Sequence, residues 1–83
     1  MIKVLYFASL RERLNQASEQ LGGEGLADVA AVVALLRQRG GVWSDAFDPE
    51  QTMMTAVNQE VASLDTPLQD GDEVAFFPPV TGG

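Results

Sequence analysis

The chain has 83 residues, of which 46% are hydrophobic, and its 12 acidic and 5 basic residues give a formal net charge of −7. This length allows one small domain, and the apolar content is enough to fold it without disulfides. A chain this acidic is repelled by phosphate groups, so nucleic acids and anionic membranes are poor candidates as partners. We expect a single domain over residues 1–83.

The sequence contains no cysteine and no histidine. A disulfide, a thiolate nucleophile and a Ser-His-Asp or Cys-His catalytic arrangement are therefore excluded within this chain. The acidic residues show no D-x-D-x-D-G loop of the kind that binds calcium. We expect no catalytic residue, no metal site and no bound cofactor.

The N-terminal residues 2–7 are rich in β-forming side chains and predict a strand. Ser9 is expected to cap a short helix over residues 10–14. The apolar run ends at residues 11–13, Arg-Glu-Arg, which does not fit a signal peptide. No segment approaches the roughly 20 apolar residues that span a bilayer, so we expect a cytoplasmic protein.

The middle of the chain predicts the main helix. Residues 17–21 indicate a short strand, and Asp28 then suits the N-cap of a helix from Val29 to about Arg39. Gly40-Gly41 supplies the stop, and residues 43–47 predict a second short helical turn that packs onto the core. The helical prediction rests on apolar residues at helical spacing, namely Val29, Val32, Val33 and Leu36.

The last third of the chain reads as strands separated by turns. Residues 53–57 predict a strand, Asn58-Gln59 a turn and residues 61–62 the start of the return strand. Residues 69–72, Gln-Asp-Gly-Asp, indicate a second turn before a last strand over residues 73–77. One dominant helix among several strands predicts the α+β class, with a mixed sheet covered on one face by the helix.

Residues 78–83 read Pro-Pro-Val-Thr-Gly-Gly and are expected to form a flexible C-terminal tail. The two prolines favour an extended backbone, and the four residues after them reach about 13 Å. Glycines leave the terminus narrow and its carboxylate unhindered, which suits entry into the active site of another protein. We expect Gly83 to be activated and converted to a thiocarboxylate, with Val80, Thr81 and Gly82 as the tail that delivers it.

Strand alternation predicts an apolar surface near this tail. Lys3 and Phe7 share one face of the first strand, and Lys3 indicates that this face points to solvent. In the last strand Glu73 and Phe77 form the corresponding set, with Phe76 inside. Exposed aromatic side chains beside a reactive tail are typical of a partner surface. The alternative is that a short segment of the chain covers them.

Three segments carry a family resemblance: residues 1–12, Met-Ile-Lys-Val-Leu-Tyr-Phe-Ala-Ser-Leu-Arg-Glu, residues 56–59, Ala-Val-Asn-Gln, and residues 70–83. They resemble the small, sulfur-carrying subunits of molybdopterin synthases, and the resemblance covers nearly the whole chain. It implies a ubiquitin-like β-grasp fold, in which the first and last strands are adjacent at the centre of the sheet.

The resemblance also implies a reaction cycle. An ATP-dependent activating enzyme adenylates Gly83, and a sulfur-transfer protein converts the adenylate to a thiocarboxylate. The tail then enters the large subunit of molybdopterin synthase and donates sulfur to cyclic pyranopterin monophosphate, in molybdenum cofactor biosynthesis. The expected complex is a heterotetramer, in which this chain is a non-catalytic subunit. Phe7, Val61 and Phe77 correspond to positions that the family uses for docking.

Three other functions fit the same features. A sulfur carrier for thiazole synthesis has the same tail chemistry with a different acceptor, although the ending Phe-Phe-Pro-Pro-Val-Thr-Gly-Gly favours the molybdopterin branch. A ubiquitin-like protein modifier would form isopeptide bonds to lysines. A ubiquitin-like binding module would carry an inert tail.

Overall fold

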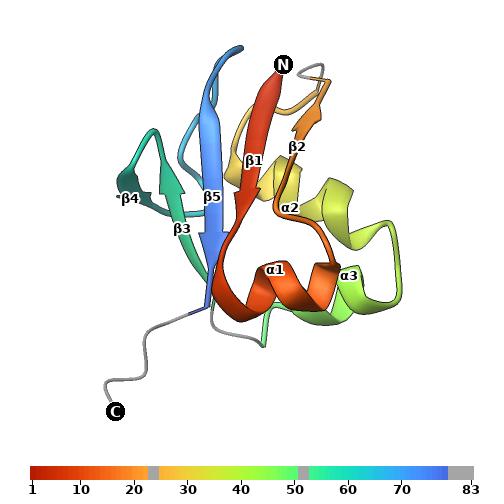
Figure 1. The fold of residues 1–83 in the computed structure, drawn as a ribbon. Coiled ribbons are helices and arrows are strands. Elements are labelled where there is room, and N and C mark those ends of the chain that lie inside the picture. The colour runs from red at the N-terminus through yellow and green to blue at the C-terminus, as the bar shows by residue number, and fades with distance from the viewer. Residues whose placement is uncertain (23–24, 51–52, 79–83) are drawn as a thin grey trace.

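The computed structural model describes residues 1–22, 25–50 and 53–78, which form a five-stranded sheet and three helices (Figure 1). Each predicted strand and helix is present, with ends that differ by a few residues from the prediction. In chain order the elements are β1 (Ile2–Tyr6), α1 (Ala8–Leu14), β2 (Ser18–Leu21), α2 (Val29–Arg37), α3 (Val42–Ala46), β3 (Met54–Val57), β4 (Glu60–Ala62) and β5 (Glu73–Phe77).

The sheet has the strand order β2-β1-β5-β3-β4, so the last strand lies at its centre. β1 and β5 run parallel, with Val4 opposite Val74, and the other neighbouring pairs are antiparallel. The expected adjacency of the first and last strands is therefore confirmed. Both are short apolar segments with alternating burial, which fits strands whose two faces meet different surroundings.

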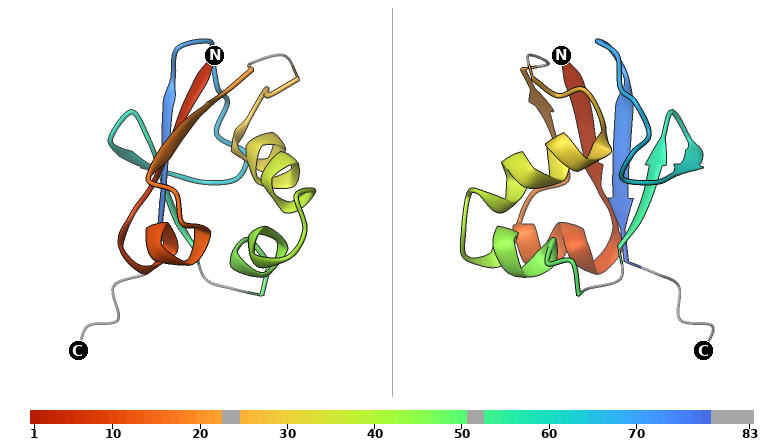
Figure 2. Two further views of the ribbon diagram at one scale, coloured as in Figure 1. Left: turned by 45° about the vertical axis from the view of Figure 1, so that its right-hand side comes forward. Right: turned by 180° about the vertical axis from the view of Figure 1, so that it is seen from behind.

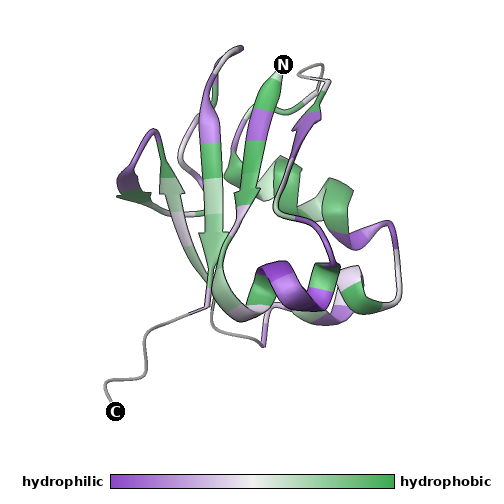
Figure 3. Cartoon of the chain, viewed as in Figure 1, coloured by the Kyte–Doolittle hydropathy of each residue, from purple (hydrophilic) through white to green (hydrophobic). Residues whose placement is uncertain are grey.

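One face of the sheet is covered by α2 and α3, whereas α1 lies at the end of the sheet (Figure 2). Hydrophobic residues follow β1, β5 and α2, as Figure 3 shows, and meet in a single core. The covered face is completely closed to solvent at Val4, Val74 and Phe76 from the sheet and at Val32 and Leu36 from α2. Burial of these apolar side chains is the main driving force for the fold.

The main helix begins as predicted. The Asp28 side chain accepts a hydrogen bond from the Ala31 backbone N–H at 2.9 Å, which satisfies one donor of the first turn. The helix ends at Arg37, two residues before the expected end. Gly40 and Gly41 both have positive φ, at 73° and 57°, and reverse the chain into α3.

The expectation that Ser9 caps the first helix is wrong. The helix begins at Ala8, its N-cap is Phe7, and no side chain accepts a cap hydrogen bond. The burial of Leu10 and Leu14 sets the rotation of this helix instead, because both side chains enter the core. The expected tail over residues 78–83 lies, from residue 79 onward, outside the described residues.

Candidate functional site

A row of apolar side chains crosses the face of the sheet that α2 and α3 leave open. Leu5 is paired with Ala75, Ala75 with Ala56, and Ala56 with Val61. Directly paired residues point to the same side of a sheet, so these four form one row. The row lies on the side away from the core, because Val4 and Val74, the neighbours of Leu5 and Ala75, face α2.

A second row lies nearer the end of β5. Phe77 is paired with Met54, and the Phe7 N–H donates a hydrogen bond to the Phe76 carbonyl at 3.1 Å. That bond extends the β1–β5 ladder by one residue and places Phe7 beside Phe77. We call the two rows together the docking patch. It consists of Leu5, Phe7, Met54, Ala56, Val61, Ala75 and Phe77.

The structure brings the three predicted docking residues onto this one face. Phe7 is 46% exposed and Val61 77% exposed, which agrees with their expected accessibility. Phe77 is only partly exposed, because the neighbouring strand places Met54 against it. Their role in docking stays a prediction. The remaining predicted site residues lie outside the described residues, and their roles also stay predictions: Val80, Thr81, Gly82 and Gly83.

The β3–β4 hairpin that presents Val61 is held against the start of β5. The Asn58 amide donates to an Asp72 carboxylate oxygen at 3.0 Å, and its carbonyl oxygen accepts from the Glu73 N–H at 3.0 Å. Hydrogen bonds from the Gln69 backbone N–H and from Asn58 lower the pKa of Asp72. A polar network therefore ties the hairpin tip to the start of β5.

The structure is thus a small sheet with one open apolar face. Comparison of the sequence with known protein families identifies the family of the chain. A sequence model of the ThiS family matches residues 4–83. This chain belongs to the ThiS family.

Two relatives of this ThiS-family chain are named molybdopterin synthase sulfur carrier subunits. The one from Escherichia coli strain K12 is 47% identical over 86 aligned positions, and the one from Haemophilus influenzae is 40% identical over 83. Both alignments cover 100% of each chain. The crystal structure of SAMP1 from Haloferax volcanii superposes with a TM-score of 0.79 at 26% identity, covering 99% of this chain and 98% of that one. The predicted resemblance and the predicted ubiquitin-like β-grasp fold are confirmed.

A polar cluster of this ThiS-family chain links β2 to the turn after α2. It consists of Tyr6, Glu19, Arg39 and Trp43. Arg39 donates to both carboxylate oxygens of Glu19, at 2.8 and 2.6 Å, and the Tyr6 hydroxyl donates to Glu19 at 2.7 Å. The Arg39 guanidinium also lies 4.4 Å from the centre of the Trp43 ring. A bidentate ion pair with a stacked aromatic ring holds these elements in a defined geometry.

This cluster shifts the pKa values of its members. Burial, together with the hydrogen bond to Glu19, raises the pKa of Tyr6 far above its ordinary value. The hydrogen bond from Arg39 lowers the pKa of Glu19. The sequence predicted Arg39 only as the approximate last residue of the main helix. No local pattern relates it to Glu19, which is 20 residues away.

Within residues 1–22, 25–50 and 53–78, no three Asp or Glu side chains lie close enough together to hold a metal ion. In the same ranges no helix has the length and apolar character needed to cross a membrane. What this part of the molecule offers is the docking patch, an open apolar surface of the kind found at the centre of protein interfaces.

Proposed function

We propose that this chain is the sulfur carrier subunit of molybdopterin synthase. Its full-length similarity to two subunits of that name supports the assignment. The structural observation that carries the proposal is the position of Phe77. This residue ends β5, the central strand and the last one before Gly83, and it belongs to the docking patch. A partner that covers the patch therefore lies where the chain leaves the sheet toward Gly83.

The docking patch fits the large synthase subunit in character. It is apolar at its centre, includes two phenylalanines and is bordered by the charged pair of Lys3 and Glu73. Protein interfaces commonly combine an apolar centre containing aromatic anchors with a polar rim. Two copies of this chain, each docked through its patch to one subunit of a large-subunit dimer, give the proposed heterotetramer.

The proposed chemistry resides in the terminal carboxylate. The Gly83 carboxylate attacks the α-phosphorus of ATP on the activating enzyme, and pyrophosphate leaves. Sulfide (HS⁻) supplied by the sulfur-transfer protein then attacks the acyl carbon of the adenylate, AMP leaves with the bridging oxygen, the S–H proton is lost, and a thiocarboxylate remains. The chain contains no histidine and no cysteine, so the groups that move protons belong to the partners. We therefore propose a non-catalytic, sulfur-donating subunit, built as one domain over residues 1–83, that binds no cofactor itself.

Intact mass spectrometry tests the proposal. The full chain is incubated with activating enzyme, ATP and a sulfide donor, and its mass is compared with that of the variant lacking Gly83. We expect the mass increase that corresponds to replacement of one oxygen by sulfur in the full chain and no change in the shortened one. An unmodified mass for both chains contradicts the proposal.

Gene deletion identifies the acceptor. Loss of molybdoenzyme activity, restored by the full chain and not by the variant lacking Gly83, supports the molybdopterin branch. A thiamine requirement with intact molybdoenzyme activity assigns the chain instead to thiazole synthesis.

One observation favours a second function, protein modification. The superposed SAMP1 is a small archaeal modifier protein, and its identity with this chain is 26%. Under this alternative the activated Gly83 is transferred to lysine amines on other proteins. Adducts of this chain that survive boiling and reductant, and that map to lysine by peptide sequencing, would support it. Their absence in cells with active carrier leaves sulfur donation as the function.

A further inference from the structure

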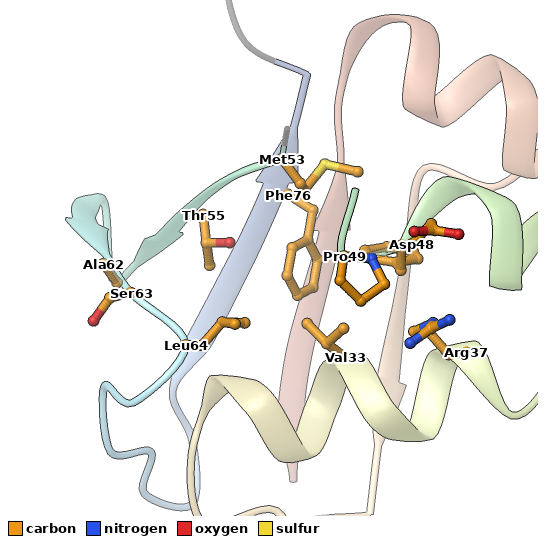
Figure 4. Close-up of a pocket in the computed structure, with 11 residues that line it drawn as sticks. Val33, Arg37, Asp48, Pro49, Met53, Thr55, Ala62, Ser63, Leu64 and Phe76 are labelled. Carbon is orange, nitrogen blue, oxygen red and sulfur yellow. The ribbon is translucent and has the colours of Figure 1, made fainter. Parts of the chain in front are cut away.

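A pocket of about 310 Å³ lies between α2 and the β3–β4 side of the sheet, on the face opposite the docking patch (Figure 4). Engineered apolar cavities of about 150 Å³ bind benzene, so this pocket has room for an aromatic body of about two rings. Its apolar walls come from the helical layer, the sheet and the chain that joins them. They are Val33, Phe47, Pro49, Met53, Leu64 and Phe76.

One polar side chain of the pocket, Thr55, makes no side-chain hydrogen bond to another described residue. Thr55 is 8% exposed, and among the described residues it is the one polar residue that is classed with the buried core. Its hydroxyl takes part in none of the side-chain hydrogen bonds formed among the described residues. Figure 4 shows this side chain directed toward the Phe76 ring, into the pocket. The Thr55 hydroxyl is therefore available to a polar group of a ligand in the pocket.

An unsatisfied group lies on the opposite side of the pocket. The Arg37 Nε is buried and has no hydrogen-bond partner among the described residues. The ion pairs of that same part of the chain join Arg39 to Glu19 and the N-terminus to Asp70, so Arg37 belongs to neither. The carboxylate of Asp48, on the same side as Arg37 in Figure 4, accepts a hydrogen bond from the Glu50 N–H. A carboxylate from a ligand would satisfy the guanidinium.

We propose that this pocket binds a small aromatic carboxylate of about two rings that carries a hydroxyl or carbonyl at its far end. The rings lie against Phe76 and Leu64, the carboxylate meets Arg37, and the distal polar group meets Thr55. Each part of the ligand matches a feature of the pocket. The rings match its volume, the carboxylate matches the unsatisfied Arg37 Nε, and the distal polar group matches the Thr55 hydroxyl. Because Phe76 faces α2, such a ligand leaves the docking patch on the other face uncovered.

The probe is 6-hydroxy-2-naphthoate, titrated into the ¹⁵N-labelled full chain and followed by amide chemical shifts. We expect saturable shifts at Val33, Thr55 and Leu64. 2-Naphthol, which lacks the carboxylate, should bind roughly tenfold or more weakly, since a hydrogen bond to a charged group is worth that much. Arg37→Gln should remove the difference between the two compounds. Thr55→Val should weaken 6-hydroxy-2-naphthoate about threefold and leave 2-naphthoate unchanged.

Two further variants locate the binding. Val33→Phe fills the pocket and should abolish the shifts, whereas Phe7→Ala, on the docking patch, should leave them intact. The dispersion of the amide signals shows beforehand which variants are folded. If a variant does not fold, the comparison of 6-hydroxy-2-naphthoate with 2-naphthol on the unaltered chain decides the outcome. The proposal is overturned if no saturable shifts occur, if they map to the docking patch, or if 2-naphthol binds as tightly as 6-hydroxy-2-naphthoate.

Discussion

Val61 lies directly opposite Ala56 in the β3–β4 pair, and 77% of its surface is exposed. An isolated chain gains little from an aliphatic side chain in this position, because water still covers it. The row from Val61 through Ala56 to Ala75 continues toward the centre of the sheet. Val61 therefore has the position of a contact residue at the margin of an apolar interface.

Substituting Val61→Asp is expected to weaken binding to the large synthase subunit about thirtyfold or more. The introduced carboxylate would be buried at the interface without a partner, and an unsatisfied buried polar group costs about 1–3 kcal/mol, more when it is charged. Isothermal titration calorimetry measures the effect. The free energy of unfolding should change by less than about 0.5 kcal/mol, since the side chain is exposed in the free protein.

Leu64→Asp is the matched control. Leu64 is also an exposed aliphatic residue, at 58%, but it lies outside the docking patch. The Leu64→Asp substitution adds the same negative charge to an already acidic chain. A general repulsion between the partners would therefore weaken the binding of both variants equally. Equal losses would contradict a specific role for Val61.

Neighbouring leucines on α2 provide a test of the core. Leu36 is completely buried, whereas Leu35 is 37% exposed on the same helix. Leu36→Ala should lower the free energy of unfolding by about 2–5 kcal/mol, because it leaves a cavity, and Leu35→Ala by less than about 1 kcal/mol. Urea unfolding followed by circular dichroism measures both. Similar losses would show that α2 does not pack as described.

The hairpin turn offers a stabilising change. Asn58 and Gln59 both have positive φ, at 50° and 72°, a region where asparagine is tolerated and glutamine is strained. Gln59→Gly should raise the free energy of unfolding by roughly 0.5–1 kcal/mol, because Asn-Gly is the preferred pair for such a turn. Thermal unfolding measures the gain, and a loss would mean that the Gln59 side chain contributes contacts.

Asn58→Gly separates backbone conformation from side-chain bonding at the same turn. It keeps the positive φ but removes the bonds to Asp72 and to the Glu73 N–H. We expect a loss of about 1–2 kcal/mol, the usual cost when hydrogen bonds are removed from a polar network. An unchanged stability would show that the turn is fixed by its backbone alone.

Features set by local periodicity were predictable from the sequence. Alternation in β1 and β5 correctly separated Phe76, which is buried, from Phe77, which belongs to the open face. Asp28 was recognised as a helix cap because a cap hydrogen bond joins residues three apart. These interactions are short in sequence, so the pattern of a few residues contains them.

Features set by contacts between distant segments were not predictable. The ion pair of Glu19 with Arg39 depends on how β2 and the turn after α2 are brought together. The pocket containing Thr55 and Arg37 depends on the space left between α2 and the sheet. Ser9 was predicted as a cap because its type suits one, but the burial of Leu10 decided where the helix lies. The first residue of that helix and the space between α2 and the sheet both depend on how distant segments pack together, which no local pattern contains.

The Glu19–Arg39 pair predicts a pH dependence of stability. Arg39 lowers the pKa of Glu19 in the folded chain below its ordinary value of 4.5. A group with a lowered folded pKa stabilises the fold above its unfolded pKa, and this contribution is lost as the pH falls through the folded pKa. The free-energy advantage of the unaltered chain over Glu19→Gln should therefore be constant above about pH 5.5 and shrink below about pH 4.5.

A double-mutant cycle with Glu19→Gln and Arg39→Gln isolates the pair, measured by urea unfolding at several pH values. We expect a coupling free energy of about 1 kcal/mol at pH 7, since the pair is bidentate but Arg39 is partly exposed and screened by solvent. Asp65 and Asp72, whose pKa values are also lowered, titrate in all four chains, so their contributions cancel in the cycle. A coupling that stays constant to pH 3 would show that Glu19 does not act through its charge.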